Sequence, residues 1–495
     1  MITQTVTLKR DGLPCILLHS NVKKITLGIV TSLLMAGTVI LSPIVSPANQ
    51  VIALLSIIII PFLISFLITK NIVDSLTIVW LNEIFFGVSG AWIKIGPLPG
   101  RGLLLLIVIF SYIAFSHKRI QKQDKISKRS LYIIFYGLIF PLFLFLYSVI
   151  VRGATIANAL SDVMRFTTVL MYFPIRDLFR RNFDICFGWI IGATSILSLL
   201  FVAMAIAPQN IRSLLIVNWM ANSTIINNYN AWGDEYFRAA NTPMILCFIG
   251  VFLGIMYALD SKISYRAQIL GLLLTSVSIA PYIVNFFRGP LLGISSAIIT
   301  IVCLCSMQKI HWNKLVRLIV MSSLIFLSGY WISVNYIPIS LTKWTIVGQQ
   351  LSEIIDPVRI EQTEIMIDAW LDEPIFGKGV GMPLKGYSRT EEAEGLAFEA
   401  QYPMVLYRVG LVGVIIIMMP FFWMITRTIR VWMKHNIFYE SYIGKLQMAI
   451  AFATMSLLTA SWTNPFFASV MSPLFIVLFL VLDDIGKIYC SIRKY

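Results

Sequence analysis

Charged residues are scarce in this chain. Only 13% of its 495 residues are Asp, Glu, Lys or Arg, whereas 58% are hydrophobic, and the mean hydropathy is +0.82. A soluble globular domain carries about twice that share of charge. Many apolar runs exceed the roughly 18 to 20 residues that a helix needs to cross a bilayer core. We therefore expect an all-α polytopic membrane protein.

Histidine and cysteine are also rare, with four and six copies. The cysteine spacing matches no metal site, and we expect no disulfides. Neither a zinc-binding spacing nor a Walker motif occurs in the segments predicted outside. These absences argue against a metalloenzyme or a nucleotide-dependent enzyme, so we expect no metal and no cofactor.

About fourteen apolar segments are predicted to span the membrane as helices. The residues before them, 1–24, lack the pattern of a cleavable signal and are predicted to lie in the cytoplasm. A membrane domain over 25–335 and C-terminal membrane helices over 403–484 follow, and 485–495 is a cytoplasmic tail. The spans are 25–46, 50–69, 71–89, 100–116, 131–151, 156–175, 183–207, 242–259, 267–286, 289–306, 318–335, 403–425, 446–461 and 466–484.

The positive charge is distributed unevenly along the chain. The connections predicted inside are all basic, among them 117–129, 176–181 and 309–317. Positive residues hold such connections in the cytoplasm, and an even number of spans places both termini there. The formal net charge of +15 is thus a topology signal, and we expect no nucleic-acid partner.

Two long connections are predicted on the outer face, over 208–241 and 336–402. The second contains 11 acidic and five basic residues, a net charge of −6. Asp356 and Pro357 can begin an amphipathic helix that Pro374 ends. The glycine-rich stretch FGKGVGMPLKG (376–386) follows a helix and a proline instead of a strand, which favours a tight turn with close backbone packing over a nucleotide-binding loop.

Arginines in the outer segments are unusual, because basic residues are otherwise concentrated inside. Arg238 ends the first large loop, Arg288 lies in a short turn between two spans, and Arg359 begins the amphipathic loop helix. Each one alone is explained by snorkelling to the interface. Together they suggest a site for phosphate or diphosphate, to which the forked guanidinium is suited.

A catalytic base on the outer face has to be something other than histidine, since all four histidines are predicted inside. Glu399 is the candidate, at the mouth of the span 403–425, where partial burial can raise a carboxyl pKa into a useful range. Four further charges, Asp74, Glu83, Asp162 and Arg165, lie within or beside predicted spans. Such residues are functional candidates, but pairing with one another explains them equally well.

Four stretches over roughly 230–415 resemble, in order, the motifs of the O-antigen polymerase and ligase superfamily. They are FRAANTP (237–243), FFRGPLLG (286–293), VRIEQTEIMIDAWLDEPIFGKGVG (358–381) and EAQYPMVLYRVGLVG (399–413). The family's histidine falls on Glu399, and Arg408 stands where the family has an acid. Because the ligase branch typically keeps that histidine, its absence favours a polymerase.

The resemblance implies a GT-C-like glycosyltransferase of lipopolysaccharide biosynthesis in the bacterial inner membrane, with its active site on the periplasmic face. It would transfer a growing glycan from undecaprenyl diphosphate to an incoming undecaprenyl-diphosphate-linked repeat unit, with inversion and without a metal. Membrane lipid and a polysaccharide chain-length regulator are the other expected partners. The implied roles are catalysis by Glu399 and Arg288, and binding of diphosphate or glycan by Arg238, Arg288, Arg359, Tyr236 and Trp370.

Two alternatives remain open. One is the ligase, which transfers the glycan to lipid A–core. The other is a flippase or transporter of lipid-linked oligosaccharides; transporters often show repeated halves, and we find no such symmetry in this chain.

Overall fold

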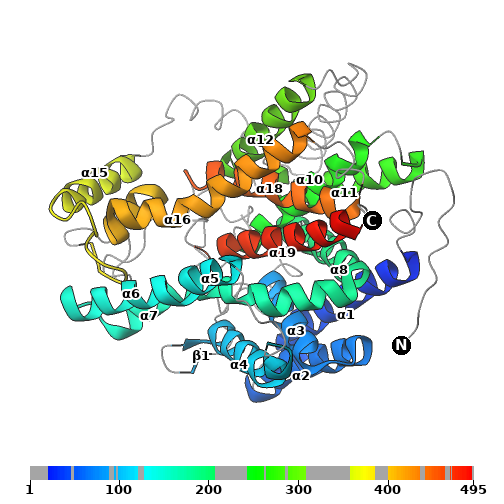
Figure 1. Ribbon diagram of the computed structural model, residues 1–495, viewed down its shortest axis with the longest axis horizontal. Helices are drawn as coiled ribbons and strands as arrows, with labels where there is room; N and C mark the ends of the chain where they lie inside the picture. Colours follow the sequence, from blue (N-terminus) through cyan, green and yellow to red (C-terminus); the bar gives the residue numbers. More distant parts are fainter. Residues whose placement is uncertain are drawn as a thin grey trace.

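The computed structural model describes residues 21–45, 50–87, 94–95, 98–120, 128–206, 242–260, 263–284, 288–307, 357–384, 400–434, 441–462, 469 and 471–492. These residues are almost entirely helical (Figure 1). Their one sheet is a minimal antiparallel pair, in which β1 (Lys94–Ile95) pairs with β2 (Leu98–Pro99).

The helices are of membrane-spanning length and composition. Six helical stretches of the described residues are long and apolar enough to cross a bilayer: Lys128–Val151, Ile156–Ala203, Tyr265–Val284, Gly289–Ser306, Gln401–Met433 and Tyr442–Ala460. Large apolar side chains such as Ile150 and Phe110 face outwards, as lipid-facing side chains do. The protein is therefore an all-α membrane protein.

The elements follow one another along the chain as α1 (Val22–Val45), α2 (Gln50–Thr69), α3 (Ile72–Phe86), α4 (Gly100–Ile120), α5 (Lys128–Ile134), the π-helical η2 (Phe135–Ile139), α6 (Phe140–Leu146), the π-helical η3 (Tyr147–Val151), α7 (Ile156–Thr167), the 3-10 turn η4 (Thr168–Met171), α8 (Tyr172–Ile206), the 3-10 turn η5 (Thr242–Leu246), α10 (Cys247–Leu259), α11 (Tyr265–Val284), α12 (Arg288–Met307), α15 (Pro357–Leu371), α16 (Gln401–Lys434), α18 (Tyr442–Ala460) and α19 (Met471–Ile492). Thirteen of the fourteen predicted spans overlap helices, and the other, 318–335, lies outside the described residues. Only six helical stretches within the described ranges qualify as membrane spans by length and composition, so the number fourteen stays a prediction.

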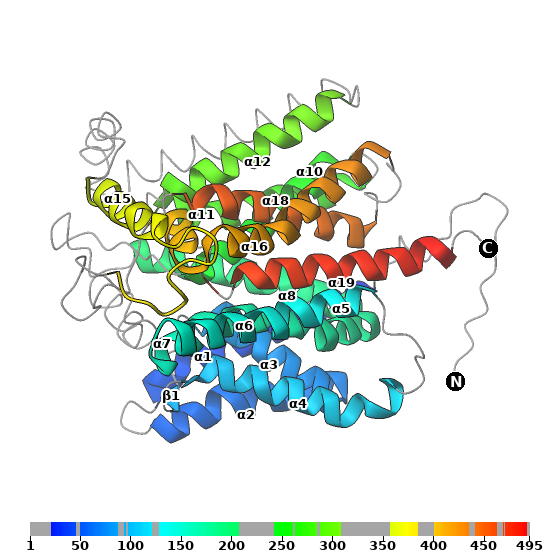
Figure 2. The same ribbon diagram turned by 60° about the vertical axis from the view of Figure 1, so that its left-hand side comes forward.

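The bundle has two chemically different ends. Arg129, Arg181, Arg427 and Lys487 lie at one end, paired with aspartates, and we call it the basic end. The turn at 152–155, α15 and the segment 372–384 lie at the other, which we call the loop end. In Figure 2 the loop end is on the left, and the last turns of α19 are on the right.

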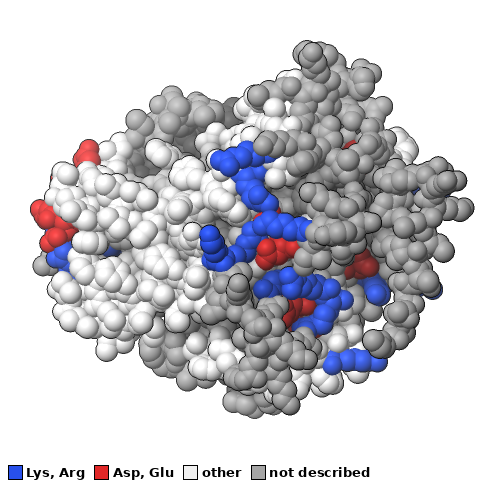
Figure 3. Space-filling view, viewed as in Figure 1, with Lys and Arg blue, Asp and Glu red and all other residues white. Residues whose placement is uncertain are grey.

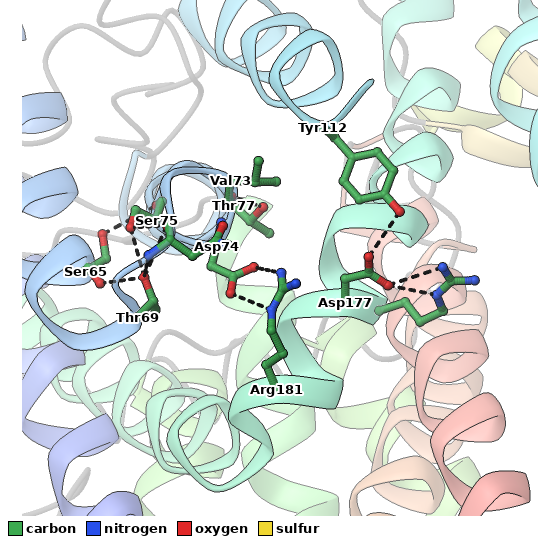
Figure 4. Close-up of polar contacts among 11 residues, drawn as sticks. Ser65, Thr69, Val73, Asp74, Ser75, Thr77, Tyr112, Asp177 and Arg181 are labelled. Carbon is green, nitrogen blue, oxygen red and sulfur yellow. Dashed lines mark hydrogen bonds and ion pairs between the residues drawn. The ribbon is translucent and has the colours of Figure 1, made fainter. Parts of the chain in front are cut away.

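The basic segment 176–181 connects two of the predicted spans, as expected, and it does so as a helical part of α8. The helix is interrupted one residue later, at Asn182 (φ −132°, ψ 39°). Ion pairs explain the helical conformation, because Arg181 Nε bonds Asp74 Oδ2 at 2.9 Å and Asp177 accepts from Tyr112 at 3.2 Å (Figure 4).

The chain reverses direction at that interruption. The first part of α8 approaches the basic end, where Arg181 meets Asp74 in the first turn of α3. Beyond it, Gly188 packs on Ile25 and Gly192 packs on Ile29 and Ser32 of α1. A β-carbon at either glycine would collide with α1, so these small residues allow two backbones to approach closely, as in many membrane helix pairs.

Burial separates the inner helices from those that face lipid. In an 18-residue window of α18 (Tyr442–Ala460), 83% of the residues are buried, against 33% in the corresponding windows of Lys128–Val151 and of Gln401–Met433. In both views α19 lies between α16 and the continuous helical stretch formed by α5, η2, α6 and η3 (Figures 1 and 2). These elements, together with α7 and η4, line the cavity that carries the candidate site.

Candidate functional site

A carboxylate held by two arginines lies near the loop end of the bundle. Asp162 Oδ2 accepts from Arg408 Nη1 at 2.6 Å and from the backbone N–H of Gly381 at 2.9 Å, and its Oδ1 bonds Arg165 Nη2. The side chains of Arg408 and Asp162 are only 8% and 12% exposed. Charges are costly to bury unless they are paired and hydrogen-bonded. Here two cations share one carboxylate.

Helix geometry explains how these three groups meet. Asp162 and Arg165 are three residues apart on α7 and therefore project from the same side. Thr155 caps the start of that helix, since its side chain accepts from the N–H of Asn158. The third group, Arg408, comes from α16, close to a break in that helix.

The break in α16 occurs at Gly410, whose backbone (φ 63°, ψ −174°) is a conformation essentially restricted to glycine. The segment 374–379 runs alongside it and bonds the exposed backbone groups. Lys378 and Gly379 donate to the carbonyls of residues 407 and 408 at 2.8 and 3.0 Å. The N–H groups of 411 and 412 donate to the carbonyls of 374 and 375 at 3.0 and 3.2 Å. A break at membrane depth is tolerated only when protein satisfies its polar groups in this way.

The glycine-rich segment packs without space for side chains. Gly377, Gly379 and Gly381 all have positive φ. A β-carbon at Gly377 would lie 2.6 Å from the Gly410 nitrogen, and one at Gly381 would collide with the backbone of Ala159. The predicted tight turn with close backbone packing is confirmed. This contact also brings the Gly381 N–H to Asp162.

Two side chains of η3 form hydrogen bonds with the glycine-rich segment 377–381. Ser148 Oγ accepts from the N–H of Val380 at 2.7 Å, and the Tyr147 hydroxyl donates to the Gly377 carbonyl at 3.2 Å. Arg152 forms a two-pronged ion pair with Glu373 at 2.7 and 2.6 Å. The hydrogen bond from Arg152 lowers the pKa of the Glu373 carboxyl below its ordinary value, and the same bond raises the pKa of Arg152.

A cavity of about 470 Å³ opens beside the Asp162 cluster. Its wall is apolar over most of its length, and its charged groups lie at its two extremes, with Asp162, Arg165 and Arg408 at the loop end and Arg129 at the basic end. The apolar wall is formed by residues of η2, α6, α16 and α19, including Tyr136, Phe140, Val405, Ile417, Phe421, Pro473, Ile476 and Leu480. Such a cavity suits a molecule with an anionic head and an apolar chain.

The structure describes only part of the predicted site. Arg238, Tyr236 and Glu399 lie outside the described residues, and Arg288 and Arg359 are described by their backbone alone, in the first turns of α12 and α15. Trp370 shares α15 with Arg359, and its indole N–H donates to the Pro374 carbonyl at 3.0 Å. This contact gives Trp370 a structural role beside the helix break.

The four intramembrane charges found in the sequence are all paired. Asp162 pairs with Arg165 and Arg408, Asp74 with Arg181, and Glu83 with Arg101. The prediction missed Arg408 as a partner, because its helix is more than 240 positions away in the chain. Its signal was present, since Arg408 is a lone cation in the apolar run 403–425.

Comparison of the chain with protein-family models, with curated proteins and with solved structures found no match.

Proposed function

We propose that the protein polymerises lipid-linked repeat units of a bacterial surface polysaccharide, as an O-antigen polymerase does. The observation that supports this best is the pair of arginines, Arg165 and Arg408, held by Asp162 at one extreme of an apolar, membrane-depth cavity. A polyprenyl diphosphate has the matching chemistry, with a diphosphate for the arginines and a long apolar chain for the cavity. The motif order of the sequence supports the same function independently.

In this proposal the loop end faces the periplasm and the basic end faces the cytoplasm, in agreement with the positive-inside rule. The acceptor hydroxyl of an incoming lipid-linked repeat attacks the anomeric carbon of the growing chain, and undecaprenyl diphosphate leaves with the bonding electrons. Arginines placed in advance stabilise the charge that develops on the leaving group. Glu399 takes the proton of the hydroxyl.

Arg408 and Arg165 join Arg238, Arg288 and Arg359 as candidates for the diphosphate. Asp162 acts as a positioning residue, because its carboxylate holds the two guanidinium groups at the cavity wall. The backbone hydrogen bonds from the segment 374–379 support this role. They hold the part of α16 that precedes its break, and so they fix the backbone position from which the Arg408 side chain extends.

A double-mutant cycle separates a substrate contact from a structural ion pair. If Arg408 binds the diphosphate, Arg408→Gln abolishes polymer formation, and adding Asp162→Asn does not restore it. If Arg408 only neutralises Asp162, Arg408→Gln keeps activity in proportion to the folded protein, because Arg165 still pairs with the carboxylate. The measurement is glycan chain length formed by purified protein from lipid-linked repeats, with Arg430→Gln as the control for loss of one cation from the same helix.

Deletion of the gene distinguishes the three candidate activities in cells. A polymerase deletion leaves single repeat units attached to the lipid A–core. A ligase deletion leaves the core without glycan, and a flippase deletion traps lipid-linked units on the inner leaflet. Either of the last two outcomes would overturn the polymerase proposal.

A further inference from the structure

The cavity has a second charged extreme, at the basic end, that the proposed reaction does not use. Along α16 its lining runs from Met404 to Trp423, which corresponds to at most about 28 Å at about 1.5 Å per residue. The hydrocarbon core of a bilayer is about 30 Å thick. The cavity therefore runs along α16 from the loop end towards the basic end, and its two charged extremes lie towards opposite ends of the bundle.

Three cations share two carboxylates at this extreme. Asp483 accepts from Arg129 at 2.6 Å, from Arg427 at 2.7 Å and from Lys487 at 2.8 Å. Arg129 also bonds Asp484, whose other oxygen accepts from Tyr172. The neighbouring Arg176 and Asp177 neutralise each other. Among the residues that the structure describes in this cluster, the cations outnumber the carboxylates by one.

The cations of this cluster are reachable from outside. Lys487 is 53% exposed and Arg427 is 32% exposed, in contrast to Arg408 near the loop end. Figure 3 shows Lys and Arg side chains gathered around a few acidic ones near the ends of α5 and α19. An anion can therefore contact Arg427 and Lys487 without a change in the fold.

Below the cluster the cavity wall has the composition of a membrane interface. Trp423 and Tyr132 are half exposed at its rim, and the Arg427 guanidinium lies over the Trp423 ring at 5.9 Å. Aromatic side chains of this kind are enriched where headgroups meet acyl chains. The wall deeper in the cavity is formed by Ile133, Ile476 and Leu480.

We propose that the basic extreme of the cavity binds the headgroup of an anionic glycerophospholipid, at a site separate from the one that holds the substrate headgroup. The lipid phosphate contacts Arg427 and Lys487, and one acyl chain enters the cavity between α5 and α16. Basic pockets between membrane helices recognise anionic lipid headgroups in this manner. An acidic peptide or a nucleic acid fits less well, because neither supplies an apolar chain for the wall beneath the cations. The lipid belongs to the leaflet at the basic end, opposite to the one that holds the substrate headgroup.

The test is lipid binding to the full-length protein in detergent micelles, counted by native mass spectrometry. We expect at least about tenfold tighter retention of phosphatidylglycerol than of phosphatidylcholine with the same chains. The variant Arg427→Gln/Lys487→Gln should lose this preference. The matched control is Arg180→Gln/Arg430→Gln, which removes two exposed cations from α8 and α16 with the same change in net charge and should keep the preference.

A cavity-filling variant tests the acyl chain. Ile476 is buried in the wall, so Ile476→Trp should lower phosphatidylglycerol binding several-fold. Glycerol phosphate, which has the headgroup charge without a chain, should not compete in the native protein. Equal retention of both lipids, an equal loss in the control variant, or full competition by glycerol phosphate would each overturn the proposal. None of these measurements requires glycan transfer, so failure here leaves the polymerase proposal standing, and the reverse also holds.

Discussion

The two charged extremes of the cavity use the same residue types in different surroundings. At the loop end, Asp162 and Arg408 are almost fully enclosed, and a backbone N–H completes the carboxylate. At the basic end, the pairs around Asp483 are made by side chains alone, and two of the three cations are open to the surface. The carboxylates at both ends are buried, and Asp483 is only 5% exposed, so the difference lies in the cations. A buried cation is held rigidly because breaking its pair is costly, whereas a cation open to solvent can leave its carboxylate at little cost while another cation still pairs with it. The loop end is therefore suited to fixed orientation of a reacting group, and the basic end to reversible lipid binding.

The largest expected effect of a substitution is at the buried extreme. Asp162→Asn leaves Arg165 and Arg408 without their shared carboxylate, and removing one partner of a buried pair costs about 3–5 kcal/mol of unfolding free energy. Thermal unfolding of the purified protein in detergent measures the change. A loss comparable to that of Arg427→Gln would mean that the two extremes do not differ in the way argued above.

The helix break near the buried cluster should be the next most sensitive feature. Gly410→Ala places a side chain at a glycine-only conformation, which costs about 1–3 kcal/mol, and against the backbone of 375–377, which adds about 1–3 kcal/mol. Gly153→Ala is the matched control, because Gly153 also has a positive φ (71°) but nothing lies within 4 Å of its β-carbon position. If both variants unfold at the same temperature, the close packing of the glycine-rich segment contributes nothing.

The exposed extreme should tolerate the loss of one cation. In Arg427→Gln, Asp483 keeps its contacts with Arg129 and Lys487, so the unfolding free energy should fall by less than about 1 kcal/mol. The same thermal measurement applies. A fall of several kcal/mol would show that this cluster holds the fold together, and its role as an exchangeable lipid site would then be untenable.

The smallest effect should be a pH dependence at the loop end. The pKa of Glu373 is lowered in the folded protein by the hydrogen bond from Arg152. This ion pair therefore contributes stability above the ordinary carboxyl pKa, and the contribution is lost as the pH falls through the lowered folded value. Native protein and Glu373→Gln should differ in unfolding temperature at neutral pH and converge in acid. A difference that stays constant down to the lowest accessible pH would contradict this assignment.

Much of the fold follows from local features of the sequence. Apolar runs such as 131–151 and 446–461 predict helices because a chain in lipid has to satisfy its backbone polar groups within each segment. The helix from Pro357 to Leu371 could be predicted from its capping residues and from Pro374. The connection at 176–181 was predictable from its basic residues, but its helical conformation up to Asn182 and the ion pair of Arg181 with Asp74 of another helix were not.

From the sequence, residues of the candidate site could be recognised one by one, but it could not be predicted which of them lie together. Asp162 and Arg165 were recognisable as charges in an apolar setting, yet nothing in the sequence indicated that Arg408 would meet them. Their meeting depends on the break at Gly410 and on the segment 374–379 that completes it.

By itself, the sequence determined the class of the protein, the positions of most helices and the uneven distribution of charge, since each depends on the chemistry of neighbouring residues in water and lipid. Only the tertiary structure decided which charges neutralise one another, where α16 breaks, and that one apolar cavity joins two cationic clusters. These features depend on distances between helices that are remote along the chain, and such distances are set by close packing and not by any local pattern.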